Sequence, residues 1–343
     1  MLYQLTYKMK NNKYDILGIG NAITDILINI DEKTLDSLKI EPGSMSLVDI
    51  SFIRNILEKK KIVKTSAGGS VANTISALAK LGIECSFAGI RKNDEYGKLF
   101  STSMQSDGIK LINNEKKEGY PSSICLVMVT PNGERTMCTY LGASGNFKNE
   151  DIDQDILDKY KIVYLEGYLF DLPEAKNIFF DIVKKSKREN FKVALSLSDG
   201  FCVDRHREDF KELINLNIDI LFSNEQEIES LFEKDFTNSI KEAGNIVGTT
   251  IVTRGNKGAA LFKNSKLITV DAIKTEVLDT TGAGDNFAAG YLYAFLNNLS
   301  IDKCLRAGVL CATDIIKHFG ARTDNNIKNL FREHNIIGNN AID

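Results

Sequence analysis

The sequence predicts an α/β fold, in which a parallel sheet carries helices on both faces and a second, smaller sheet forms a lid. Three observations support this prediction. Beyond residue 150, strand-like and helix-like segments alternate, which is typical of a parallel sheet with crossover helices. Two β-rich segments, 23–47 and 122–142, interrupt this pattern in the first half of the chain. The length of 343 residues, with 43% hydrophobic residues, is sufficient for a large buried core.

Hydrophobic runs and the residues that end them predict the individual elements. Residues 14–20 and 26–30 are apolar runs typical of strands, and 69–81 has apolar residues at helical spacing before a strand at 85–90. Segments 123–130 and 134–141 flank a Pro-Asn-Gly turn, which predicts a hairpin. The second half adds strands at 162–165, 192–197, 218–222 and 250–253, helices at 174–187 and from Arg205 and Asn224, a hairpin at 259–262 and 267–270, and closing helices at 283–296 and 301–317.

We expect one folded domain over residues 14–330, with tails at 1–13 and 331–343. The β-rich segments 23–47 and 122–142 are expected to form its lid, because a small sheet beside a ligand cleft can close over it. The residues before Met9 show no pattern, so Met9 is an alternative start to Met1.

Charge and composition exclude several classes of protein. Forty-three Lys and Arg against 46 Asp and Glu give a net charge of −3, so no positive field exists to hold a nucleic acid. The six cysteines form no C-x-x-C pair and the three histidines show no ligand spacing, which argues against a zinc site or a disulfide framework. No apolar run reaches the roughly 18 residues of a membrane span, and the first 13 residues contain neither the apolar run nor the small-residue cleavage site expected of a signal peptide. We therefore expect a reduced, cytoplasmic protein without a membrane partner.

The strongest local motif is DTTGAGDNF at 279–287, directly before an apolar helix. Gly282, Ala283 and Gly284 leave the backbone N–H groups at the helix start accessible, and the helix dipole favours an anion there. Asp285 lies in the same place and could accept a proton from an attacking hydroxyl group. The alternative is a glycine turn in which Asp285 only caps the helix.

Two further motifs point to a small polar ligand. In AGGSVAN, Gly69 allows close approach of a ligand to the backbone and Asn73 offers a donor and an acceptor, although a tight turn explains them equally well. In GIGNAITD, the carboxylate of Asp25 can accept from two vicinal hydroxyls of a sugar, and a solvent-facing strand end is the alternative. Ile23 excludes the dinucleotide fingerprint G-x-G-x-x-G, and no P-loop motif occurs anywhere in the sequence.

Two weaker segments have the composition of a nucleotide site. Asn224 and Glu227 stand at the start of a predicted helix, where Glu227 could face hydrated Mg²⁺ or simply complement the helix dipole. Thr253, Gly255 and Gly258 follow a strand and could lie along a nucleotide.

Taken in order, GIGNAITD, AGGSVAN, NEQE, TRGNKG and DTTGAGDNF resemble the ribokinase-like carbohydrate kinases of the PfkB family over about residues 14–322. The resemblance implies a Rossmann-like αβα sandwich with a β lid, ATP and Mg²⁺ as requirements, and a monomer or homodimer. It also implies that Asp285 is the base, that residues 282–284 form the anion hole, and that Asp279 could join a K⁺ site. The other implied positions are Asn21, Asp25, Gly69, Asn73 and Arg135 around the acceptor and its phosphate, and Asn224, Glu227, Thr253, Gly255 and Gly258 around ATP.

Positions where these motifs differ from the ribokinase pattern indicate the kind of acceptor. Two features resemble the adenosine-kinase branch. Asn21 stands four residues before Asp25, and Ser70 stands where ribokinases commonly have lysine. The segment EGYLF at 166–170 also resembles that branch, which makes Phe170 a candidate for the wall of a base pocket. These residues favour a nucleoside acceptor. A free sugar such as ribose or fructose stays open as the alternative acceptor.

Two other functions fit the sequence less well than a kinase does. A catalytically silent binding protein has no need for a base in an anion hole, so Asp285 argues against it. An enzyme of the same fold acting on a hydroxymethyl-pyrimidine or pyridoxal is disfavoured by Asn21 and Asp25, which match a ribose-holding pattern.

Overall fold

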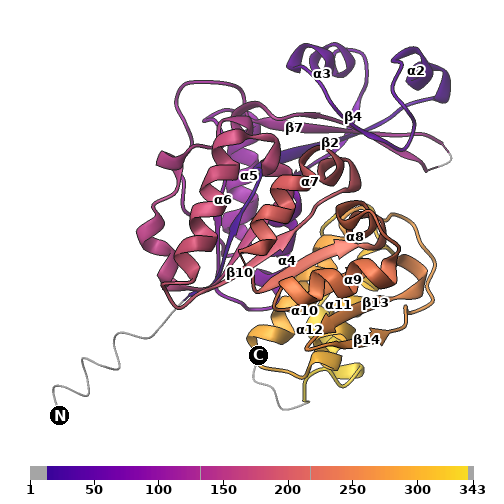
Figure 1. Cartoon of the computed structure of the whole chain (residues 1–343). Helices are drawn as coiled ribbons and strands as arrows, with labels where there is room; N and C mark the ends of the chain where they lie inside the picture. The colour runs from indigo at the N-terminus through magenta and orange to yellow at the C-terminus, as the bar shows by residue number, and fades with distance from the viewer. Residues whose placement is uncertain (1–13, 132, 217, 339–343) are drawn as a thin grey trace.

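A nine-stranded sheet forms the centre of the protein in a computed structural model that describes residues 14–131, 133–216 and 218–338 (Figure 1). Its order is β14-β13-β12-β11-β10-β9-β1-β5-β6. The strands from β6 to β12 are parallel, and β13 and β14 close one edge as an antiparallel hairpin. The bounds are β1 (Tyr14–Ile19), β5 (Cys85–Ala88), β6 (Lys110–Leu111), β9 (Tyr160–Glu166), β10 (Lys192–Ser196), β11 (Ile220–Asn224), β12 (Thr250–Thr253), β13 (Ala259–Lys263) and β14 (Lys266–Val270).

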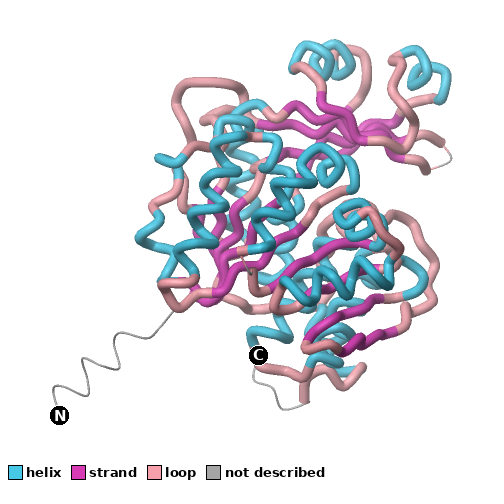
Figure 2. The backbone as a smooth tube through the Cα atoms, viewed as in Figure 1, coloured by secondary structure: helices cyan, strands magenta, loops and turns pink. Residues whose placement is uncertain are grey.

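Helices cover both faces of this sheet (Figure 2), because its parallel strands bury side chains on both sides. Along β9, Ile162 and Tyr164 join one core and Val163 and Leu165 join the other. One face packs against α4 (Ser70–Lys80), α5 (Glu95–Ser106), α10 (Ala283–Leu296), α11 (Ile301–Ile315) and α12 (Ile327–Glu333), and the other against α6 (Pro173–Ser186), α7 (Gly200–Asn215), α8 (Glu225–Phe232) and α9 (Phe236–Ile246).

A five-stranded sheet of order β3-β8-β7-β2-β4 projects beyond one end of the main sheet, at the top of Figure 1. Its outer face is covered by two short helices whose Leu35, Ile53 and Ile56 pack on the sheet residues Ile26 and Leu126. The elements are β2 (Ile23–Asn29), α2 (Glu32–Ser37), β3 (Met45–Leu47), α3 (Ile50–Leu57), β4 (Ile62–Gly68), β7 (Ser123–Val129) and β8 (Arg135–Tyr140). The inner face of this lid is left free to line a cavity.

Short 3₁₀ segments connect the lid and the main sheet and follow several strands. They are η1 (Gly142–Asn146), η2 (Asn149–Asp151), η3 (Gln154–Lys159), η4 (Gly167–Asp171) and η5 (Gly255–Lys257).

The order of the strands places a crevice at one end of the main sheet. From β1 the chain builds β5 and β6 on one side and β9 to β12 on the other, so the strand order reverses between β1 and β9. Ligands of such sheets bind outside the carboxyl ends of the strands at this point of reversal. Asn21 follows β1 and Glu166 ends β9, so both lie at the crevice.

The αβα sandwich with a small β lid is confirmed, and so is the hairpin of β7 and β8. The lid differs from the prediction because it also contains β4, which was not predicted as a strand and which pairs with β2. Helix α7 begins at Gly200 rather than at Arg205, since Asp199 caps it by accepting from the N–H of Cys202.

The expected C-terminal tail from 331 is wrong in its boundary. Helix α12 continues to Glu333, and Phe331 and Ile336 are buried in the core that α10 and α11 share. Met1 and Met9 lie outside the described residues, as does Asn132 in the hairpin turn. Within the described part of the chain, each helix is too short or too polar to cross a bilayer.

Candidate active site

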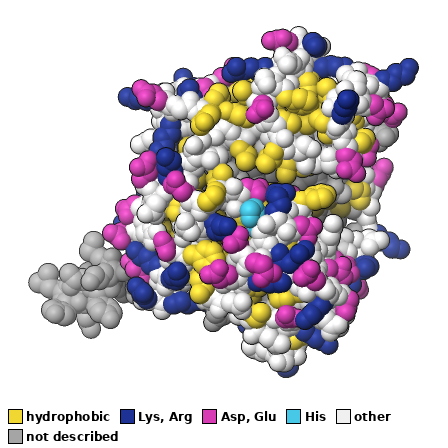
Figure 3. All heavy atoms as spheres, turned by 45° about the horizontal axis from the view of Figure 1, so that its top comes forward, with side chains coloured by type: hydrophobic (Ala, Val, Ile, Leu, Met, Phe, Trp, Pro, Cys, Tyr) yellow, Lys and Arg dark blue, Asp and Glu magenta, His cyan; other side chains and the backbone are white. Residues whose placement is uncertain are grey.

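A cavity of about 710 Å³ lies between the lid and the carboxyl ends of the main-sheet strands. Figure 3 shows it as a hollow beneath the lid, with hydrophobic side chains gathered on the lid side. Its lining comes from β2, β3 and β8 of the lid, from the ends of β9 to β12, and from residues 277–285 before and within the first turn of α10. This volume is sufficient for a small-molecule ligand.

The first turn of α10 forms one wall of the cavity. Gly282 is the N-cap with a φ of 75°, and a side chain there would lie 2.6 Å from the Cβ of Ala321, so only glycine fits. A side chain at Gly284 would meet nothing within 4 Å. The N–H groups of Gly284 and Asp285 have no acceptor among the described residues, while that of Ala283 bonds to Thr280 O. This turn therefore presents two free N–H donors at a positive helix end, and the anion hole stays a prediction.

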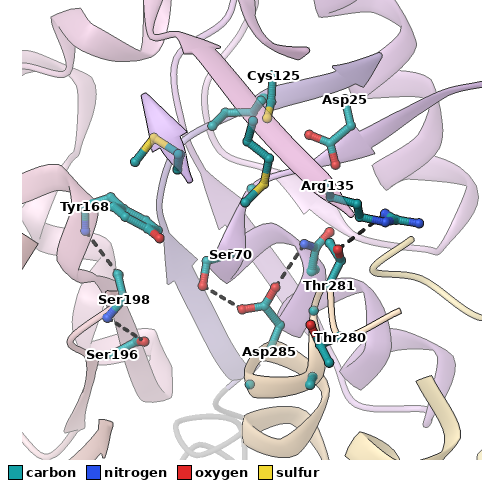
Figure 4. A pocket seen from close by; sticks show the side chains of 18 of the residues that line it. Asp25, Ser70, Cys125, Arg135, Tyr168, Ser196, Ser198, Thr280, Thr281 and Asp285 are labelled. Atoms are coloured by element: carbon teal, nitrogen blue, oxygen red, sulfur yellow. Dashed lines mark hydrogen bonds between the residues drawn. The ribbon is translucent and has the colours of Figure 1, made fainter. Parts of the chain in front are cut away.

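Asp285 lies in this turn and points toward the start of α4 (Figure 4). Its carboxylate oxygens accept from Ser70 Oγ at 2.7 Å and from Asn73 Nδ2 at 3.0 Å. Burial raises the pKa of Asp285 to about 6, while these two hydrogen bonds and the charge of Arg322 lower it. The group is therefore mostly ionised at neutral pH and is able to accept a proton.

Helix α4 reaches Asp285 because two glycines precede it. Gly69 has a φ of 96°, and a side chain there would overlap the backbone carbonyl of Asn21. This close approach aims Ser70 and Asn73 at the carboxylate of Asp285. The two motifs that the sequence presents separately thus form one hydrogen-bonded unit.

Asp25 projects from β2 of the lid into the same cavity (Figure 4). A side chain at Gly68 would overlap its carboxylate, so the neighbouring strand must carry glycine there. Burial raises the pKa of Asp25 to about 7, although the charges of Arg322 and Arg135 lower it. No described residue donates a hydrogen bond to this carboxylate, which leaves it free to accept from hydroxyl groups of a ligand.

Glu166 at the end of β9 is a site residue that the sequence did not single out. It accepts from Asn21 N at 3.2 Å, from Asn21 Nδ2 at 2.7 Å and from Val71 N at 3.0 Å. Burial raises the pKa of Glu166 to about 7, and these hydrogen bonds oppose that shift. A side chain at Gly20 would overlap Glu166, so the glycine in GIGN makes room for it. In the sequence, the position of Glu166 at the end of a strand predicted to be buried was the feature that could have identified it.

Arg135 and Asp279 form an ion pair of 2.7 Å that joins the lid to the main body. The Asp279 carboxylate also accepts from Thr281 N at 3.0 Å, Thr281 Oγ1 at 2.7 Å and Gly320 N at 2.6 Å. The carboxylate of Asp279, which was expected to join a K⁺ site, thus pairs with a guanidinium group and accepts from three further donors. Arg135, which was expected near a phosphate, lines the cavity and also donates to Thr281 Oγ1. Both roles stay predictions.

The expected nucleotide residues divide into two groups. Asn224, Glu227 and Thr253 line the cavity, whereas Gly255 and Gly258 are not among its lining residues. Glu227 is buried and forms a reciprocal capping box with Asn224, in which Asn224 N and Nδ2 donate at 2.9 and 2.6 Å. Burial raises the pKa of Glu227 to about 7.

The residues fit a Mg²⁺ ion held through water and ligand phosphates rather than by a protein cage. Among the described residues, no group of three His, Cys, Asp or Glu is placed to hold a metal. Mg²⁺ commonly keeps several waters and binds through one or two carboxylates and substrate phosphates, which agrees with the single carboxylate of Glu227 at this wall.

Phe170 does not line the cavity, contrary to the prediction. It is 1% exposed and its ring stacks on Phe210 with centroids 4.1 Å apart and meets Phe179 edge-on at 5.8 Å. Both residues 168 and 170 belong to η4, where three residues complete a turn, so the two side chains point in different directions. Tyr168 is the one that lines the cavity, and its N–H donates to Ser198 Oγ at 3.2 Å (Figure 4).

The chain belongs to the pfkB family of carbohydrate kinases, which its residues 44–328 match. It is similar to the adenosine kinase of Sinorhizobium meliloti, with 32% identity, coverage of 94% of this chain and 99% of that one, and a TM-score of 0.87. It is also similar to an adenosine kinase of Dictyostelium discoideum (27% identity; 89% of this chain, 95% of the other) and to an uncharacterized sugar kinase of Archaeoglobus fulgidus (30%; 71% and 96%). Kinases of this family use ATP and generally Mg²⁺.

Proposed function

We propose that this kinase transfers the γ-phosphoryl group of ATP to the primary hydroxyl group of an adenosine-like nucleoside, with Asp285 as the general base. One observation carries the proposal. The Asp285 carboxylate, the free N–H groups of α10 and the free carboxylate of Asp25 all face one cavity, which also has apolar side chains on part of its lid side.

Asp285 would take the proton of the attacking hydroxyl group, and the N–H groups at Gly284 and Asp285 would hold oxygens of the transferring phosphoryl group. Phosphoryl transfer depends mainly on positioning and on charge stabilisation, so a base within an anion site supplies most of what the protein must provide. Mg²⁺, held through water near Glu227, would neutralise charge on the phosphates. Asp279 has no role as a cation ligand in this proposal, because Arg135 occupies its carboxylate.

The acceptor end of the cavity supports a nucleoside. Asp25 would accept from the ribose hydroxyls, and Asn21, whose Oδ1 is buried without a partner in the described part of the chain, also lines the cavity. A free sugar would cover the polar residues and leave the apolar wall in contact with water, whereas a base would bury it. That wall is formed by Ile23, Met45, Leu47, Met137, Leu141 and Tyr168. The likeness to the adenosine kinase of Sinorhizobium meliloti supports the same acceptor.

A free sugar is the second candidate, because the groups that would hold vicinal hydroxyls, Asp25 and Asn21, do not require a base. The likeness to the sugar kinase of Archaeoglobus fulgidus is consistent with it. A panel that measures ADP release from ATP with adenosine, other nucleosides, ribose and fructose, each alone, separates the two. The nucleoside proposal expects the highest kcat/KM with adenosine, and a preference for ribose or fructose would replace it by the sugar-kinase function.

The general base is tested with Asp285→Asn. We expect a kcat lower by about 10²- to 10⁴-fold with little change in KM for either substrate, the range for loss of a general base. Asp302→Asn, a change at an exposed carboxylate on α11, serves as the matched control and should leave kcat unchanged. Near-normal turnover of Asp285→Asn would remove this residue from the chemistry.

A further inference from the structure

The loop that follows α11 bonds to residues of the site, although its residues 320–322 do not line the cavity. Three consecutive residues each bond to a different part of the site. Gly320 N donates to Asp279 Oδ2 at 2.6 Å, Ala321 O accepts from Asn286 Nδ2 at 3.0 Å, and Arg322 Nε donates to Asn73 Oδ1 at 3.1 Å. The last contact connects the loop with a residue that bonds directly to Asp285.

The guanidinium group of Arg322 is held in place by α5. Its NH1 donates to Ser103 Oγ at 3.2 Å and lies 3.8 Å from Asp107 Oδ2, and its side chain is 15% exposed. Burial lowers the pKa of Arg322, but the charges of Asp107, Asp25 and Asp285 oppose that shift, and an arginine stays protonated in proteins. Arg322 thus presents a fixed positive donor to Asn73.

This donor decides which way the Asn73 amide faces. An asparagine side chain has an oxygen that accepts at one corner and an NH₂ group that donates at the other, and a half-turn exchanges them. With Oδ1 toward Arg322, Nδ2 donates to Asp285 Oδ2 at 3.0 Å. In the opposite orientation the NH₂ group would face the donors of Arg322 and the oxygen would face the carboxylate of Asp285, so both contacts would be repulsive.

Arg322 is not among the residues that line the large cavity, and it lies with Asn73 at a small depression behind it. It therefore acts through another residue rather than on a substrate. We propose that Arg322 is a positioning residue, which fixes the Asn73 amide so that its NH₂ group holds the Asp285 carboxylate in the orientation for proton transfer. This inference rests on the proposed role of Asp285.

The kinetic test compares Arg322→Met, Arg322→Lys and Arg306→Met with the wild type, on the acceptor that the panel selects. Misplacement of a reacting group costs up to about 10²-fold in rate, so we expect Arg322→Met to lower kcat by about 10- to 100-fold with KM for ATP nearly unchanged. Arg322→Lys should recover part of kcat, because lysine also offers only donors to Oδ1. Arg306, an exposed arginine on α11, is the control and should have no effect. An unchanged kcat in Arg322→Met, or an equal loss in the lysine variant, would overturn the proposal.

A double-mutant cycle distinguishes positioning from general destabilisation. If Arg322 acts through Asn73, then Arg322→Met should cause no further loss of kcat in a protein that already carries Asn73→Ala. If the losses of kcat in the two single variants instead multiply in the double variant, the two residues act separately. That result would overturn the positioning role of Arg322.

A measurement on the free protein keeps this test separate from the test of function. The side-chain NH₂ signals of Asn73 in a ¹⁵N spectrum, identified by their loss in Asn73→Ala, should exchange slowly with solvent in the wild type and in Arg306→Met, and rapidly in Arg322→Met. Unchanged protection in Arg322→Met would overturn the positioning role. Absence of turnover with every acceptor would overturn the proposed function alone, since the exchange measurement needs no substrate.

Discussion

The position of Phe170 gives the sharpest test of the acceptor site, because the sequence and the structure assign it different roles. Replacement by alanine removes a ring that is 1% exposed, stacked on Phe210 at 4.1 Å and in edge contact with Phe179 at 5.8 Å. Truncation of a buried phenylalanine costs about 3–5 kcal/mol through lost transfer free energy and the cavity left behind. We therefore expect a large loss of stability and no change in the preference between acceptors.

The assay is urea unfolding followed by far-UV circular dichroism, since the chain contains no tryptophan to report by fluorescence. Phe201→Ala is the matched control. It removes the same group from a side chain that is 64% exposed on α7, and should change the free energy of unfolding by about 0.5 kcal/mol or less. The ratio of kcat/KM for adenosine and ribose, measured where both proteins are folded, should equal that of the wild type in both variants.

Tyr168→Ala, unlike Phe170→Ala, should change the preference between acceptors. Tyr168 lines the cavity, so its removal should lower the preference for adenosine over ribose by about 5- to 30-fold, which corresponds to about 1–2 kcal/mol of lost aromatic contact and burial. A Phe170→Ala protein that keeps its stability but loses selectivity for the nucleoside would contradict the core position of Phe170. A Tyr168→Ala protein in which both acceptors are affected equally would contradict the role of Tyr168 in the pocket.

Two further predictions concern the buried carboxylates of the cavity. Asp25→Ala should raise the KM of the acceptor and leave the KM of ATP nearly unchanged, because each lost hydrogen bond to a charged group costs about 1.5–3 kcal/mol. Steady-state kinetics with both substrates varied measures the two KM values. An equal rise of both KM values would contradict the role of Asp25. Burial raises the pKa of Asp25, Glu166 and Glu227 to about 7 and that of Asp285 to about 6, so the folded protein binds more protons than the unfolded chain between about pH 4.5 and 7. The free energy of unfolding should therefore fall as pH rises through this window, and less steeply in Glu166→Gln. Urea titrations at several pH values measure it, and a flat or rising profile for the wild type would show that these shifts are absent.

Much of the fold could be predicted because its signals are local. The helix at Ala283–Leu296 and the strand at Thr250–Thr253 have the bounds that hydrophobic periodicity gives. The β7 and β8 hairpin follows from the turn between them. In contrast, β4 contains the β-branched residues Ile62, Val63 and Thr65 but no alternation of apolar and polar residues, and its place in the lid depends on pairing with β2.

The position of Asp285 in the first turn of a helix after a glycine turn follows from the sequence, because capping and glycine conformation depend on neighbouring residues. The residues around Asp285 come from distant parts of the chain. Asn73 and Arg322 are separated by 249 residues, and Asn21 and Glu166 by 145, so no periodic pattern links them. The same holds for Phe170, whose direction depends on the rings of α6 and α7 that pack against η4. Residue types set the local geometry, whereas partners and burial arise only when distant segments pack together.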